Sequence, residues 1–224
     1  GQVWFNSTSN VLKGQRPNLS GSWASVSAMN TARYGAGSAA ASGTAALVFG
    51  GYPPVQDITE SWNGSAWTEV NDMNQANSFV VGTGTSTAAI GFGGGPGDSP
   101  GLQDRTELWN GTNWTEVNDL NTARQRMGSS GVQTSAVGFG GDTDPGPSSA
   151  LSETWNGTNW TETNDLNTAR RGLAGAGVNN TAAVAFGGIS SPPSNDVDIT
   201  ENWNGTNWTE VNDLNTARER MAGS

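Results

Sequence analysis

The sequence predicts an all-β protein built from repeated four-stranded antiparallel units, and three observations lead to this fold class. The stretch WNGTNWTEVNDLNTAR at residues 109–124 returns unchanged at 203–218, with one substitution at 155–170 and in looser form at 62–77. Two anchors in each unit, a Trp and a Phe followed by two glycines, recur with a period near 46 residues. With 32 glycines among 224 residues and 33% hydrophobic content, the chain suits many short strands joined by tight turns.

The first two strands of each unit, named a and b, are recognised by the size of their residues. Strand a consists of small residues, which fit where a strand is crowded against its equivalents around an axis. It is expected at residues 35–41, 81–87, 128–132 and 172–178. Strand b is apolar and ends at the recurring Phe, where the Gly-Gly pair lets the chain bend tightly.

The last two strands of each unit, named c and d, are expected to form a hairpin. Strand c alternates in polarity from Ile58 to Trp62, which is the pattern of a half-buried strand. An Asn-Gly pair follows strand c, and such a pair between alternating segments strongly predicts a hairpin. The pairs are Asn63-Gly64, Asn110-Gly111, Asn156-Gly157 and Asn204-Gly205. Each unit is therefore predicted to be a four-stranded antiparallel meander.

The ordered motifs resemble the kelch repeat. They run apolar-apolar-Phe-Gly-Gly, a variable loop, Glu-x-aromatic, a further Trp, and then Met/Leu-x-x-Ala-Arg. The resemblance covers essentially the whole chain and implies that each unit is one blade of a β-propeller. The chain has Trp-Asn-Gly where the family usually has Tyr-Asp-Pro, and it lacks the usual histidine near strand a. A particular kelch activity therefore does not carry over with the fold.

Five blades are predicted, forming a single domain over residues 1–224. After four full units only a strand a remains at residues 219–224, while the start of the chain offers strands b, c and d at 2–6, 10–14 and 21–26. Pairing these N-terminal strands with the C-terminal strand would close the ring and leave no long unpaired edge. The blades are then 33–77, 78–123, 124–169, 170–217, and 218–224 together with 1–32. The alternative is an excerpt from a longer array with one incomplete blade.

Composition and charge exclude several classes of function. A net charge of −10 with a single Lys argues against binding to nucleic acid or to an anionic membrane surface. No apolar run approaches the roughly 18 residues that predict a membrane-spanning helix. His and Cys are absent, which removes thiol chemistry, Cys/His zinc sites and histidine bases. We therefore expect no nucleic-acid partner, no membrane insertion and no enzymatic activity.

Residues that occupy the same place in every blade are expected to serve the architecture. The recurring Trp residues are interpreted as packing between blades rather than as sugar-stacking platforms. The recurring Glu and Arg are interpreted as structural ion pairs or backbone caps rather than as paired catalytic carboxylates. These residues are Glu60, Glu107, Glu153 and Glu201, with Arg33, Arg124, Arg170 and Arg218.

Function is expected where the blades differ, which is in the loops between strands b and c. These loops vary in length and sequence, contain eight of the nine prolines, and share one face with the d–a connections. The candidate ligand-binding residues are Tyr52, Asp98, Asp104, Asp142, Asp144, Asp196 and Asp198. Four of these offer oxygen ligands of the kind that Ca²⁺ takes, although no complete calcium-loop spacing is present. These Ca²⁺ candidates are Asp142, Asp144, Asp196 and Asp198, and no other cofactor is expected.

We expect a non-catalytic recognition module, extracellular or virion-associated, that binds a surface glycan or a protein through the b–c loops. Residues 1–14, GQVWFNSTSNVLKG, resemble the short β-rich boundaries in tail-fibre and other structural proteins of bacterial viruses. The alternative is a structural or adaptor propeller, monomeric or packed into a larger assembly. The near-identity of the units also fits a recent duplication or a designed repeat protein, and an enzyme is the remaining alternative.

Overall fold

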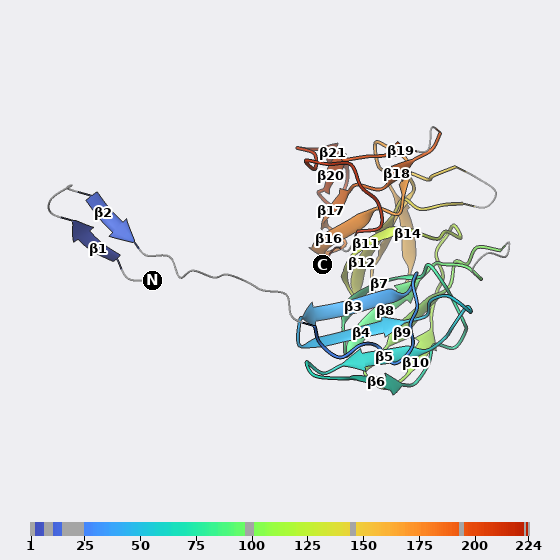
Figure 1. Cartoon of the computed structure of the whole chain (residues 1–224). Helices are drawn as coiled ribbons and strands as arrows, with labels where there is room; N and C mark the ends of the chain where they lie inside the picture. The colour runs from blue at the N-terminus through green and yellow to red at the C-terminus, as the bar shows by residue number, and fades with distance from the viewer. Residues whose placement is uncertain are drawn as a thin grey trace.

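The chain folds as an all-β protein, as predicted. The computed structural model describes residues 3–6, 11–14, 25–96, 101–143, 147–192, 195–221 and 223, the first two stretches by their backbone alone. Within these residues there is no helix, and every strand pairing is antiparallel. The repeated units form the four-stranded sheets that dominate the molecule (Figure 1).

Four sheets, here called blades 1 to 4, each contain strands a, b, c and d in meander order. Blade 1 consists of β3 (Gly37–Ser42), β4 (Ala45–Phe49), β5 (Thr59–Trp62) and β6 (Trp67–Val70). Blade 2 consists of β7 (Val81–Thr85), β8 (Ala88–Phe92), β9 (Thr106–Trp109) and β10 (Trp114–Glu116). Blade 3 consists of β11 (Gly128–Val132), β12 (Ser135–Phe139), β13 (Ser152–Trp155) and β14 (Trp160–Thr163). Blade 4 consists of β16 (Ala174–Asn179), β17 (Ala182–Phe186), β20 (Thr200–Trp203) and β21 (Trp208–Glu210).

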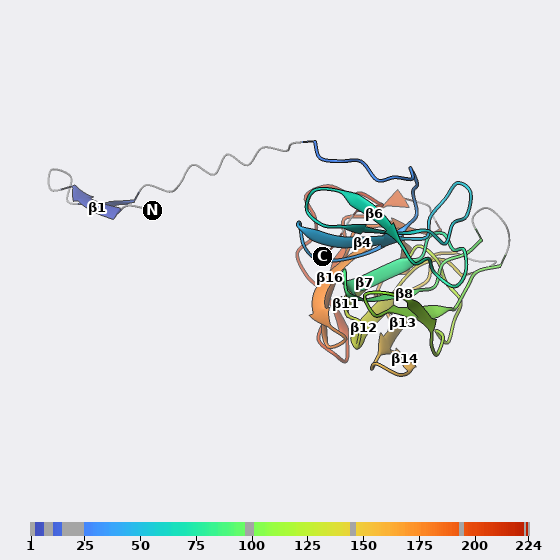
Figure 2. The ribbon, with the colours of Figure 1, turned by 90° about the horizontal axis from the view of Figure 1, so that it is seen from below.

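The blades stand side by side in a propeller-like arrangement, with the a strands innermost (Figures 1 and 2). β3, β7, β11 and β16 contact one another in that order. The same four strands line a cavity of about 780 Å³, which we call the channel. Strand a is therefore the inner strand of each blade, where the sequence places its small residues.

Neighbouring blades are joined by aromatic pairs. The Phe that ends strand b of one blade packs against the Trp that opens strand d of the next, with ring centroids 4.6–4.9 Å apart. The indole N–H of that Trp also donates to a buried hydroxyl at the start of strand c in the preceding blade. The pairs are Phe49–Trp114, Phe92–Trp160 and Phe139–Trp208, and the hydroxyls belong to Thr59, Thr106 and Ser152. The prediction that recurring tryptophans pack between blades is confirmed for these three.

The small residues of strands a and b make room for the Phe rings. A Cβ atom on Gly91 would lie 2.8 Å from Cε2 of Phe49, and one on Gly138 would lie 2.6 Å from Cε2 of Phe92. Both contacts are too close for real side chains, so the ring of one blade requires glycine in the next. Crowding of the inner strands against their equivalents is thus only part of the reason for their small residues.

The c–d hairpins form at the Asn-Gly pairs, as predicted. In blade 2 the side chain of Asn110 accepts hydrogen bonds from the backbone N–H groups of Thr112 and Asn113, both at 2.9 Å. Gly111 has φ of 92°, a backbone conformation that favours glycine. The same turn recurs at Asn63, Asn156 and Asn204.

The b–c loops and the d–a connections share one face, as expected from strand alternation. Each b–c loop pairs through its backbone with the connection that enters the same blade, as in the Tyr34–Tyr52 and Gln125–Asp142 bridges. In blade 4 this pairing extends to a small sheet of three strands. These are β15 (Arg170–Arg171), β18 (Ile189–Ser190) and β19 (Asn195–Asp196).

The predicted closure of the ring is not seen among the described residues. The N-terminal strands β1 (Val3–Asn6) and β2 (Val11–Gly14) pair with each other in a two-stranded sheet that stands away from the blades (Figures 1 and 2). Residues 25–26 and the described part of 219–224 form no strand, and residues 21–24 lie outside the described residues.

Candidate recognition site at the channel mouth

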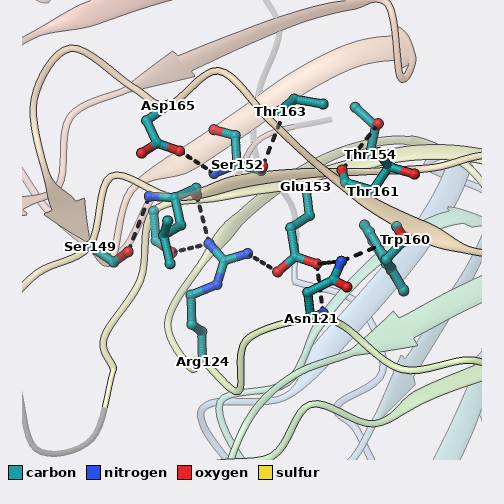
Figure 3. Close-up of polar contacts among 12 residues, drawn as sticks. Asn121, Arg124, Ser149, Ser152, Glu153, Thr154, Trp160, Thr161, Thr163 and Asp165 are labelled. Carbon is teal, nitrogen blue, oxygen red and sulfur yellow. Dashed lines mark hydrogen bonds and ion pairs between the residues drawn. The ribbon is translucent and has the colours of Figure 1, made fainter.

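The recurring Arg and Glu residues clamp the connection that enters a blade onto strand c of that blade. In blade 3, Glu153 accepts hydrogen bonds from Nη2 of Arg124 at 2.9 Å and from the backbone N–H of Asn121 at 2.8 Å (Figure 3). Arg124 also donates to the backbone oxygens of Gly140 and Leu151. Burial lowers the pKa of the Arg124 guanidinium, and the Glu153 carboxylate opposes this shift. The prediction of structural ion pairs is confirmed at Arg33–Glu60, Arg124–Glu153 and Arg170–Glu201.

One predicted glutamate and one predicted arginine form no such pair among the described residues, for different reasons. Blade 2 has Asn77 where the other blades have Arg, so Glu107 is bound by the backbone and side-chain N–H groups of Asn74 and not by a guanidinium among the described residues. Burial raises the pKa of the Glu107 carboxyl, and the Asn74 hydrogen bonds oppose this rise. Arg218 is exposed, and its Nε donates to the backbone oxygen of Thr216.

Replacing Asn77 with Arg is expected to complete the missing clamp. The new guanidinium would meet Glu107 and the backbone oxygen of Gly93, which already accepts from Asn77 at 2.7 Å. We expect the free energy of unfolding at pH 7 to rise by roughly 1.5–3 kcal/mol, the range for a hydrogen bond to a charged group. Because the folded pKa of Glu107 is raised, its contribution to stability in the parent chain is present at low pH and is lost as the pH rises through that pKa.

The gain in Asn77→Arg should therefore be largest above the raised pKa of the Glu107 carboxyl and should shrink as the pH falls through that pKa, because the carboxyl of the parent chain then becomes neutral. Urea unfolding of both proteins between pH 4 and 8 measures it. A gain that does not depend on pH would show that the new side chain acts by packing.

The channel opens on the b–c face at an open arc of four backbone hydrogen bonds. Five equivalent residues have left-handed φ values between 53° and 63°, one in each connection that enters a blade and one after strand d of blade 4. The N–H of each residue after the first donates to the carbonyl oxygen of the one before, at 2.6, 3.4, 2.9 and 2.8 Å in turn. The residues are Gly35, Phe79, Arg126, Gly172 and Arg220.

The residues around this arc line a cavity of about 650 Å³, which we call the channel mouth. Its lining includes Tyr34, Phe79, Arg126, Arg171, Glu219 and Arg220. The Tyr34 ring is 54% exposed and lies 5.5 Å from the Tyr52 ring and 6.1 Å from the Phe79 ring. The Arg126 guanidinium lies over the Phe79 ring, 4.6 Å from its centroid. Aromatic and cationic groups therefore meet at one opening.

Asp142 forms ion pairs with two of these guanidinium groups. Its oxygens lie 3.4 Å from Nη1 of Arg126 and 3.2 Å from Nη1 of Arg171. The Asp142 side chain is 9% exposed, whereas those of Arg126 and Arg171 are 35% and 25% exposed. One buried carboxylate thus holds two cations at the mouth and balances only one of them.

The predicted binding residues fall into three groups. Tyr52 and Asp142 belong to the channel mouth through their contacts with Tyr34 and with the two arginines. Asp104 and Asp196 are exposed and Asp198 is partly buried, and all three lie in b–c loops away from the mouth lining. Asp98 and Asp144 lie outside the described residues.

The most variable residues of the mouth were not among the predicted binding residues. As a pair, the two residues after the recurring Ala-Arg, or after Ala-Asn in blade 2, differ in every copy. They are Tyr34-Gly35, Ser78-Phe79, Gln125-Arg126, Arg171-Gly172 and Glu219-Arg220. A column-by-column comparison of the repeats identifies them, because the positions before them are almost invariant.

The described residues show no group of three acidic, histidine or cysteine side chains that could hold a metal ion. Asp142, a Ca²⁺ candidate, is instead engaged by two arginines. In the same part of the chain, no helix has the length and apolar character needed to cross a membrane.

Comparison with known proteins adds no relative: neither a protein-family model nor a curated protein sequence matches the chain.

Proposed function

We propose that this chain is a kelch-type, non-catalytic recognition module, displayed on a virion or cell surface, that binds a glycan or a protein. The binding surface is the face formed by the b–c loops and the channel mouth. A structural or adaptor role within a larger assembly is the second candidate, because a propeller fold alone does not define a function.

The observation that carries this proposal is the distribution of differences between the blades. The c strands, the d strands and the c–d turns repeat almost without change, whereas the b–c loops and the residue pairs at the mouth differ from blade to blade. Both variable sets lie on one face and are joined by backbone bridges such as Ser78–Gly95. A repeated scaffold that varies at one face is the arrangement of a binding surface on a rigid support.

We also propose that a fifth blade packs between blade 4 and blade 1. Phe186 and Trp67 are partly exposed, although their counterparts in the other blades are buried. Among the described residues the buried hydroxyl of Thr200 has no partner, whereas the equivalent hydroxyls each accept an indole N–H from the next blade. Both surfaces have the form of an interface that lacks its second half.

Residues 1–32 and 218–224 are the proposed source of that blade. The connection that enters blade 1 is bound to that blade in the same way as the other connections, because Asn30 and Arg33 both bind Glu60. Trp23 precedes Asn30 by seven residues, the spacing between Trp160 and Asn167. Its indole is proposed to cover Phe186 and to donate to Thr200. In the β1–β2 register Lys13 takes the position of Glu60, so this interface would lack a carboxylate for Arg218.

The experiment that tests the function is a binding screen of the purified full chain against arrayed glycans and whole cells, with and without Ca²⁺. A loop-tip variant replaces residues 97–101, 143–147 and 191–194 with Gly/Ser linkers of equal length. A control variant replaces Ser86 and Thr87, in an a–b turn on the opposite face, in the same way. We expect binding by the parent and the control, and its loss in the loop-tip variant at an unchanged melting temperature.

Other outcomes would contradict the proposal. Binding that survives in the loop-tip variant and is lost in the control would place the site on the opposite face. A folded parent that binds neither glycans nor cells would favour the structural role. Dependence on Ca²⁺ would assign ligand roles to the acidic loop residues.

A further inference from the structure

We infer that the channel mouth binds a carboxylate-bearing sugar, such as a uronic or sialic acid unit of a surface glycan. This inference rests on the proposed function and names the chemistry of its ligand.

The first observation is backbone strain at residues that need not carry side chains. At the five left-handed positions of the mouth, blades 1 and 4 use Gly35 and Gly172, which adopt such φ values without steric cost. Phe79, Arg126 and Arg220 adopt the same conformation with φ values of 53–55°. A non-glycine residue there costs on the order of 1 kcal/mol, and strain of this kind concentrates at binding sites.

The second observation is the placement of the positive charge. The chain has ten Lys and Arg residues and a net charge of −10. Three arginines are ion-paired with glutamate in the buried clamps, whereas Arg126, Arg171 and Arg220 line the mouth. Asp142 and Glu219 are the acidic partners of these three in the described residues, so one positive charge is left over. The channel mouth thus carries a net positive charge, although the protein as a whole is acidic.

The third observation is the geometry of the donors. Arg126 and Arg171 each make a single contact with the Asp142 carboxylate, through Nη1. A guanidinium has five N–H donors in a planar fork, so the remaining donors can bind a second carboxylate in bidentate fashion. Asp142 holds the two forks in place before the ligand arrives, which reduces the entropy lost on binding.

The aromatic residues favour a sugar as the carrier of that carboxylate. Tyr34 is largely exposed and joins Tyr52 and Phe79 in a cluster beside the arginines. Tyrosine presents an apolar ring with a polar tip, which suits a pyranose with C–H faces and hydroxyl edges. An extended peptide would instead seek unpaired backbone groups, and those of Phe79, Arg126 and Gly172 are already bonded around the mouth.

The test uses the full chain and an immobilised panel of uronic-acid and sialic-acid oligosaccharides, each beside its methyl ester, with penta-glutamate as the acidic peptide. Arg126→Gly restores the residue type found in blades 1 and 4, so the fold is expected to survive. Arg126→Lys keeps the charge but removes the bidentate fork. Arg218→Gln removes the same charge from an arginine that does not line the mouth.

We expect at least one acidic sugar to bind, and roughly ten- to a hundred-fold weaker binding for its ester and in Arg126→Gly, as for the loss of a hydrogen-bonded charge. Arg126→Lys should lie between Arg126→Gly and the parent, and Arg218→Gln should match the parent. Equal binding of acid and ester, or binding that is unchanged in Arg126→Gly, would overturn the inference. Capture of penta-glutamate alone would replace the sugar with an acidic peptide.

The failure of this inference can be told apart from the failure of the proposed function. If the loop-tip variant loses binding to cells or to a neutral glycan while Arg126→Gly keeps it, the recognition face stands and only the acidic ligand is wrong. If neither set of variants changes any binding, the recognition face itself is wrong.

Discussion

Glu153→Gln is expected to lower the free energy of unfolding by about 3–5 kcal/mol, the cost of removing one partner from a buried ion pair. The Arg124 side chain is 0% exposed, and its Nε has no hydrogen-bond partner. Without the Glu153 carboxylate, this guanidinium would stay buried with its charge uncompensated. Urea denaturation at pH 7, monitored by tryptophan fluorescence, measures the change.

Glu107→Gln is the matched control, because it makes the same substitution at the same position of blade 2. No arginine faces Glu107, and burial already raises the pKa of its carboxyl. A neutral amide there leaves no buried cation behind, so the loss should be about 1 kcal/mol or less. Equal losses in the two variants would mean that these glutamates stabilise the fold by binding backbone N–H groups and not by pairing with arginine.

The repeated architecture follows from the sequence because its determinants are local. Alternation in strand c, the Asn-Gly turns and the Phe-Gly-Gly bends each lie within a few residues, and they define the four blades that are observed. The Arg–Glu clamps were also predictable, since both partners recur in register. The unpaired Glu107 could have been foreseen from Asn77, which replaces the recurring Arg in blade 2 alone.

The channel mouth does not follow from local patterns. Its arc of backbone hydrogen bonds joins residues 44–48 positions apart, and their side chains share neither size nor charge. The Gly- and Pro-rich sequence around Asp142 predicts an exposed acidic residue in a loop. It is held instead by Arg126 and Arg171, 16 and 29 residues away, which come from two different connections. Only the fold brings these groups together.

Trp160→Ala is expected to cost about 3–5 kcal/mol, the range for truncating a buried aromatic side chain. The indole is 6% exposed, packs 4.6 Å from the Phe92 ring and donates to the Thr106 hydroxyl at 2.9 Å. Its loss leaves a cavity between blades 2 and 3 together with a buried hydroxyl that has no donor. The midpoint of thermal unfolding, followed by circular dichroism, reports this loss.

Trp67→Ala removes the equivalent side chain from blade 1. Its effect distinguishes a blade 1 edge that is open to solvent from one that a fifth blade covers. If the edge is open, the partly exposed Trp67 loses little, and Thr200→Val should stabilise the chain by replacing a buried hydroxyl that has no partner. If a fifth blade covers both surfaces, Trp67→Ala should approach the loss in Trp160→Ala. Thr200→Val should then cost about 1 kcal/mol, the same as is expected for Thr106→Val, because each substitution removes the acceptor of an indole N–H. We expect the second pattern. Phe–Trp and Trp–hydroxyl contacts join blades 1 to 4, and the equivalent groups at the two ends of the array, in blade 4 and in blade 1, lack their partners among the described residues.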